Sequence, residues 1–85
     1  KWYKKAAEHG DASAQSSLGY MYSKGHGVLK DNRRAYMWHN LSSYNGLEQI
    51  GGRYIDKIAK KMTLADISKA QDMSNRCLES NYTDC

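Results

Sequence analysis

The sequence predicts an all-α fold, an alpha-alpha superhelix of stacked helix pairs with a capping helix at its C-terminal end. Residues 2–10 return in altered form at 38–46, so that Trp2 corresponds to Trp38 and Gly10 to Gly46. The two copies lie 36 positions apart. Repeats of this length are typical of stacked helix pairs, each of which cannot bury its apolar face alone. The chain also lacks proline and phenylalanine, which leaves Ala, Tyr, Leu, Ile and Met to form the core of closely packed helices.

We expect the 85 residues to form one repeat domain, 1–85. Residues 1–10 are interpreted as the second helix of a preceding repeat, ended by Gly10. The chain starts without methionine and inside a repeat, so we expect a fragment or a processed product. Trp2, Tyr3 and Ala6 would face an upstream helix in a longer solenoid, which raises the hypothesis of self-association through this exposed N-terminal helix.

Residues 11–46 are predicted to form one complete repeat. Its first helix begins at Asp11 and ends near Ser23, and its apolar residues fall at helical spacing: Ala14, Leu18, Met21 and Tyr22. Gly19 lies inside this helix, where glycine costs about 1 kcal/mol relative to alanine. We therefore infer that a bulky side chain, such as a repeat tryptophan, lies against Gly19.

A loop and a second helix complete this repeat. Gly25 and Gly27 in residues 24–30 can adopt positive backbone angles, and Val28 can fill the gap between helices. Asp31 is predicted to cap the helix that follows. That helix runs to about Asn45, before Gly46, and has one apolar stripe: Ala35, Trp38 and Leu41.

Residues 47–85 are predicted to form a degenerate repeat and a capping helix. Helical periodicity continues in four residues: Ile50, Tyr54, Ile55 and Ile58. Gly51 and Gly52 replace Gln15 and Ser16 of the first copy. A capping box at residues 63–66 then predicts a last helix that ends near Glu79. Its inward stripe is Ile67, Ala70, Met73, Ser74 and Cys77.

The spacing of ten residues resembles the Sel-1-like repeat, a tetratricopeptide-related helix pair. These residues are Ala14, Leu18, Gly19, Tyr22, Gly25, Gly27, Val28, Asp31, Ala35 and Trp38. Residues 62–71 also resemble the ending found after such repeats, whereas Leu29 stands where the family usually has proline. The resemblance implies an alpha-alpha superhelix that serves as an adaptor or scaffold for protein or peptide partners, commonly in bacterial signalling, secretion or envelope contexts.

The first helix of each pair normally lines the concave side of such a stack, so its free positions are candidates for partner binding. In the first copy these are Ser13, Ser16, Ser17 and Tyr20, and the counterparts in the second copy are Gln49, Gly52, Arg53 and Asp56. Tyr20 and Arg53 are the candidate anchors, because Tyr and Arg are enriched at the energetic centres of interfaces. The alternative is that both side chains serve only the fold.

Cys77 and Cys85, eight positions apart, are the only cysteines. A disulfide between them would staple the C-terminal tail and suits an oxidising compartment, although two free thiols in a cytosolic protein fit the spacing as well. The ending resembles those of exported family members. This resemblance favours the bridge and a periplasmic or secreted location over a cytoplasmic one.

No motif for catalysis, a metal or a cofactor is visible in the sequence. His9, His26 and His39 lack metal-ligand spacing, and the glycines around His26 lack the Lys-Ser/Thr of a phosphate loop. No nucleophile has a visible base and orienter, because the serines fall at helix-surface or packing positions and neither cysteine has a histidine in its own segment. We therefore predict a non-catalytic protein-interaction module without metal or cofactor.

Two other functions remain as alternatives. One is a small hydrolase acting on cell-wall material, since a catalytic triad can assemble from distant residues. The other is a nucleic-acid-binding module, because the net charge is +4. The basic residues of the chain are spread over several helices and loops, which argues against nucleic-acid binding. No apolar run reaches the roughly 20 residues that cross a bilayer, so membrane insertion is not expected.

Overall fold

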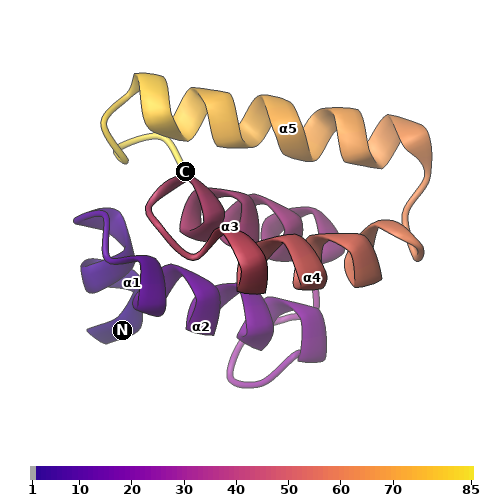
Figure 1. Cartoon of the computed structure of the whole chain (residues 1–85), viewed down its shortest axis with the longest axis horizontal. Helices are drawn as coiled ribbons and strands as arrows, with labels where there is room; N and C mark the ends of the chain where they lie inside the picture. The colour runs from indigo at the N-terminus through magenta and orange to yellow at the C-terminus, as the bar shows by residue number, and fades with distance from the viewer. Residues whose placement is uncertain (1) are drawn as a thin grey trace.

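The computed structural model describes residues 2–85, without the side chains of Trp2, Tyr3 and Ile50. The described residues form five helices and no strand: α1 (Trp2–Glu8), α2 (Ala12–Lys24), α3 (Asn32–Tyr44), α4 (Glu48–Ala59) and α5 (Leu64–Glu79). The all-α class is therefore confirmed. Figure 1 shows α1 and α2 on one side of α3 and α5 on the other. This stacking is compatible with an alpha-alpha superhelix.

Three side chains cap helices at starts that the sequence predicted, and two of them, Asp31 and Thr63, were predicted as caps. The Asp11 carboxylate accepts a hydrogen bond from the amide of Ala14 at 3.0 Å, at the start of α2. Asp31 accepts hydrogen bonds from two amides in the first turn of α3, and the Thr63 hydroxyl accepts one from the amide of Asp66 at 3.1 Å. Each cap satisfies amides that have no partner inside their own helix.

Helix α3 is the centre of the fold, since it packs against α2, α4 and α5. Residues 35–39 are all buried, and so are Leu41 and Ser42. The prediction of a single apolar stripe on this helix was therefore too narrow. The physical reason is that three neighbouring helices cover α3, so polar side chains such as His39 are buried along with Trp38.

Two glycines let helices approach α3 closely. A Cβ built on Gly19 would lie 2.8 Å from two atoms of the His39 ring, and one built on Gly51 would lie 3.0 Å from the His39 carbonyl oxygen. A bulky ring does lie against Gly19, but it belongs to His39, so the predicted tryptophan was wrong. Trp38 instead packs in the core cluster with Leu18.

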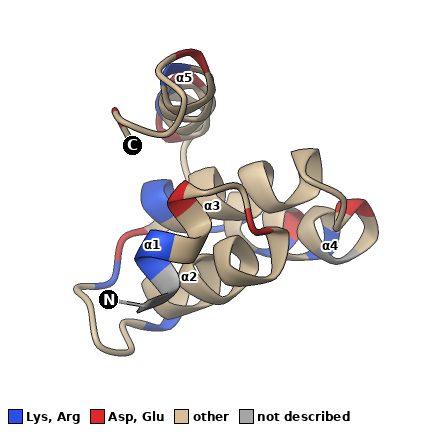
Figure 2. Cartoon of the chain, turned by 90° about the vertical axis from the view of Figure 1, so that its left-hand side faces the viewer, with Lys and Arg blue, Asp and Glu red and all other residues tan. Residues whose placement is uncertain are grey.

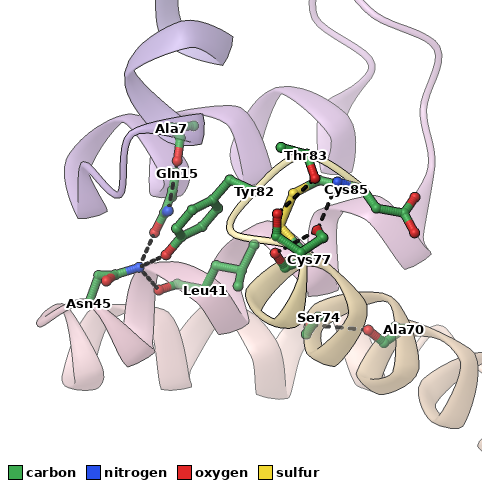
Figure 3. Close-up of a disulfide and its surroundings, with 12 residues drawn as sticks. Ala7, Gln15, Leu41, Asn45, Ala70, Ser74, Cys77, Tyr82, Thr83 and Cys85 are labelled. Atoms are coloured by element: carbon green, nitrogen blue, oxygen red, sulfur yellow. Dashed lines mark hydrogen bonds between the residues drawn. A yellow bond between two sulfur atoms is a disulfide. The ribbon is translucent and has the colours of Figure 1, made fainter.

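The C-terminal tail folds back onto the helices and carries a disulfide between Cys77 and Cys85 (Figure 3). Within this tail, the Tyr82 hydroxyl accepts a hydrogen bond from the Asn45 amide at 2.9 Å. The same amide lies 3.0 Å from Oε1 of Gln15. Because Asn45 ends α3 and Gln15 lies in α2, the network joins the tail to both helices.

Charges of both signs are interspersed on α5, which Figure 2 shows end-on. The helix is thus a polar cover for the stack on its outer side, with Ala70, Ser74 and Cys77 buried on its inner side. Of the helices in residues 2–85, none is both long and apolar enough to cross a membrane. The proposed self-association surface, Trp2 and Tyr3, lies outside the described side chains, and Ala6 beside it is half-buried.

Candidate functional site

Tyr20 of α2 and Tyr54 of α4 meet edge to face, with ring centroids 6.4 Å apart. Tyr54 also stacks on His39 of α3, at 4.6 Å and an interplanar angle of 8°. The Tyr20 ring in turn meets the ring of His26 edge to face at 5.9 Å. Three helices thus contribute to one aromatic ladder, in which each contact is of a favourable geometry.

The ladder exists because α2 and α4 are both held tightly against α3. Gly19 and Gly51 have no side chain to keep these helices away from His39. Tyr20 directly follows Gly19 in α2, and Tyr54 lies one turn after Gly51 in α4. The close approach therefore brings the two tyrosines over the same stretch of α3.

A hollow of about 380 Å³ lies beside the two tyrosines. We call it the tyrosine groove. Its lining combines hydroxyl groups with a flexible apolar side chain, and the lining residues are Ser16, Ser17, Tyr20, Met21 and Tyr54. Tyr20 is 40% exposed, so its ring presents an apolar face and a polar hydroxyl to solvent in the way that interface tyrosines do.

A second hollow, of about 250 Å³, adjoins the tyrosine groove and shares Tyr20 and Tyr54 with it. We call it the lysine hollow. Its other lining residues are Ser23, Lys24, Asn32, Lys57, Ile58 and Lys61. The lining therefore includes three lysines and no acidic residue. Lys24 Nζ also lies 6.0 Å from the centroid of the Tyr20 ring, within reach of a cation–π contact.

His39 is the innermost ring of this aromatic ladder and is fully buried. Neither ring nitrogen has a hydrogen-bond partner among the described residues, and the same holds for the hydroxyl of Ser42. Burial in these surroundings disfavours the charged imidazolium and lowers the pKa of His39 from 6.5 to about 4. The ring is therefore neutral at physiological pH and acts as a flat packing surface for Tyr54.

The structure gathers some of the sequence-predicted binding residues and separates others. Ser16, Ser17 and Tyr20 line the tyrosine groove together. The others lie elsewhere: Ser13, Arg53 and Asp56 are exposed outside both hollows, Gln49 lines a separate hollow, and Gly52 faces open space. The residue of α4 that lines the tyrosine groove is thus Tyr54 and not Arg53.

Sequence reasoning placed Tyr54 in an apolar stripe and so missed its place in the groove. In the repeat register, Tyr54 is the counterpart of Leu18, a buried core residue. A tyrosine at a leucine position was the available signal, because its hydroxyl must reach a polar partner or solvent. Lys24 and Lys57 carried no such signal, since lysine in the last turn of a helix is ordinary.

The described residues show little that could perform chemistry. They include no group of three or more His, Cys, Asp or Glu side chains that could hold a metal ion. Cys77 and Cys85 are joined in the disulfide, and none of the hydrogen bonds in residues 2–85 links a serine to a histidine. The His9 ring pairs with the Lys5 carbonyl within its own segment.

The ten motif residues occupy their expected elements in this structure. Gly25 and Gly27 have positive φ angles of 72° and 75° in the loop after α2. Ala14, Leu18 and Gly19 are buried residues of α2, and Ala35 and Trp38 are buried residues of α3. Asp31 caps α3, and Tyr22 and Val28 are half-buried.

Comparison with known families agrees with this arrangement. The family model of the Sel1 repeat matches residues 1–11 and 12–47, which is more than half of the chain. The comparisons with curated proteins and with solved structures give no match. The matched segments contain α1, α2 and α3 with the loop glycines and the capping aspartate. The chain therefore belongs to the Sel1 repeat family.

Proposed function

We propose that this chain is a non-catalytic adaptor or scaffold module that binds a segment of a partner protein in the tyrosine groove. Sel1 repeats generally mediate protein–protein interactions. The observation that carries the proposal is the meeting of Tyr20 and Tyr54. These residues come from the first helices of two successive pairs and form one partly exposed aromatic surface.

The packing beneath the groove supports this function. Tyr54 is held by its stack on the fully buried ring of His39, and α2 and α4 are held against α3 at Gly19 and Gly51. A preformed surface loses little conformational entropy when a partner binds, and that saving increases affinity. Shallow hollows along a helical stack also suit an extended or helical segment better than a small substrate, which needs a concave site that encloses it.

The hydrolase alternative receives no support from the geometry. A serine or cysteine nucleophile needs a base within hydrogen-bond reach, and within residues 2–85 the histidine most deeply buried, His39, has no hydrogen-bond partner. Both cysteines are in the disulfide. Adaptor function therefore remains the proposal that the arrangement of these residues favours.

Site-specific photo-crosslinking tests the proposal. A benzophenone amino acid replaces Tyr20 in the groove or, as a control, Lys69 on the exposed side of α5, and extracts of the cells that produce the protein are irradiated. We expect a protein cross-linked from position 20 and absent from position 69. Mass spectrometry identifies this protein and the segment that carries the cross-link, so that the segment can be made and its affinity measured by calorimetry.

Paired alanine variants then decide whether the groove is the binding site. We expect Tyr20→Ala to weaken binding of that segment by at least about tenfold, the loss typical of an interface anchor. Tyr44→Ala is the matched control, since Tyr44 is 72% exposed outside both hollows, and should leave the affinity unchanged. Equal effects of the two variants, or no cross-linked protein at all, would refute the proposed function.

A further inference from the structure

We propose that the partner segment is acidic and that its carboxylates bind in the lysine hollow. This inference rests on the proposed function, because it specifies the chemistry of the partner that occupies the adjoining tyrosine groove. Lys24 at the end of α2, Lys57 in the last turn of α4 and Lys61 just after it line one hollow of about 250 Å³. Three positive charges thus converge from two parts of the chain that are far apart in the sequence.

No carboxylate in residues 2–85 forms an ion pair with these lysines. The only ion pair of the described residues is Asp31–Arg34, at 3.4 Å. Asp31 is further engaged in capping α3, and Asp56 is exposed but does not line the hollow. The hollow therefore offers uncompensated positive charge to a ligand from outside.

Helix dipoles explain part of this arrangement, but not all of it. Lysine in a last turn stabilises its own helix, and each helix C-terminus carries about half a negative charge. Two such termini account for roughly one negative charge, whereas three lysines line the hollow. A net positive potential remains, and it is complementary to a carboxylate-bearing segment.

The position of the lysines favours an acidic protein segment over a nucleic acid. A nucleic acid carries a phosphate on every nucleotide, so its binding sites track the backbone with a stripe of basic residues. Here the adjoining tyrosine groove has no Lys or Arg in its lining. A polypeptide with carboxylates at one end and an apolar side chain beside them matches both hollows, with Met21 and the tyrosines contacting the apolar part.

Fluorescence anisotropy on the full 85-residue chain tests this chemistry. The probe is a fluorescein-labelled peptide, acetyl-Leu-Tyr-Glu-Asp-Glu-Glu, and its comparison peptide has Gln and Asn in place of the acidic residues. We expect the acidic probe to bind and the amide version to bind at least about fivefold more weakly. Raising the salt from about 0.05 to 0.5 M should remove most of this difference, because the screening length shrinks.

Charge-matched variants locate the site. Lys57→Gln/Lys61→Gln should weaken binding of the acidic probe roughly 3- to 10-fold, whereas Lys4→Gln/Lys5→Gln on α1 removes the same charge outside the hollow and should have little effect. Circular dichroism confirms that both variants are folded. Equal weakening by both pairs would show unspecific attraction and overturn the proposal. Absence of probe binding, or tighter and equally lysine-dependent binding of an oligothymidine, would also overturn it.

The two proposals can fail separately. If a cross-linked partner segment loses affinity with Tyr20→Ala but not with Lys57→Gln/Lys61→Gln, the groove binds a protein and the acidic chemistry is wrong. If the acidic probe binds in the lysine hollow but no protein cross-links from position 20, the hollow is an anion-binding site and the adaptor function is wrong. Loss of affinity in both variants supports both proposals.

Discussion

The His39 ring of α3 lies directly against the backbone of Gly19 in α2. A Cβ built on Gly19 would stand 2.8 Å from both Cδ2 and Nε2 of that ring. The ring cannot move away, because it is fully buried and stacked on Tyr54. This contact sets the distance between the two helices of the repeat, and through Tyr54 it also positions the groove.

Gly19→Ala should therefore destabilise the protein. The added methyl group overlaps a ring that has no space to yield, and overpacking of this kind costs about 1 to 3 kcal/mol. Gly52→Ala is the matched control, since Gly52 is also helical but a Cβ placed on it would meet nothing within 4 Å. There we expect a gain of about 0.5 to 1 kcal/mol. Guanidinium unfolding followed by circular dichroism measures both, and a stable Gly19→Ala variant would contradict the tight contact.

The stability of the fold should fall as the pH drops from about 6.5 to 4. Burial lowers the pKa of His39 to about 4 in the folded state, so between these values the unfolded chain binds a proton that the folded chain does not. The free energy of unfolding is unaffected by this group above pH 6.5 and decreases below it, by up to about 3 kcal/mol. His39→Leu should lack the histidine contribution, so the test is the difference between the two pH profiles.

Removal of the disulfide should release the C-terminal tail and lower stability. The bridge spans eight positions, and closing so short a loop contributes about 2 kcal/mol. Cys77→Ala/Cys85→Ala should lower the free energy of unfolding by this amount or slightly more, because Cys77 is also a buried core residue. Thermal unfolding with and without a reducing agent checks the cause: the reductant should destabilise the native protein and leave the variant unchanged.

Gln15 should be far more important for stability than an ordinary surface glutamine. It is fully buried, its amide donates a hydrogen bond to the Ala7 carbonyl at 2.9 Å, and its oxygen accepts one from Asn45 (Figure 3). Gln15→Ala removes the hydrogen-bond partner of the Ala7 carbonyl and of the Asn45 amide and opens a cavity, which should cost about 2 to 4 kcal/mol of stability. The exposed Gln49 provides the control, and Gln49→Ala should change stability by less than about 0.5 kcal/mol. Similar losses in the two variants would show that the network contributes little.

The elements of this fold could be predicted from sequence because their signals are local. Asp11, Asp31 and Thr63 each cap a helix with their own side chain, and Gly25 ends α2 with a positive φ of 72°. Such interactions lie within a few residues of one another, so spacing in the sequence reveals them. The repeat period also predicted that the helices form pairs, and the motif within the repeat indicated the Sel1 repeat family.

The groove and the core polar contacts depended on the tertiary structure, because they join residues that the sequence separates. The ring against Gly19 could have been Trp38 or His39, and only the rotation of α3 under three neighbouring helices decided for His39. Tyr54 lines the groove for the same reason, because the packing of α4 against α3 sets the direction of its side chain. Local chemistry thus determined where each helix begins and ends, whereas close packing on all sides of α3 decided which side chains meet, since a small rotation of one helix changes every contact along it.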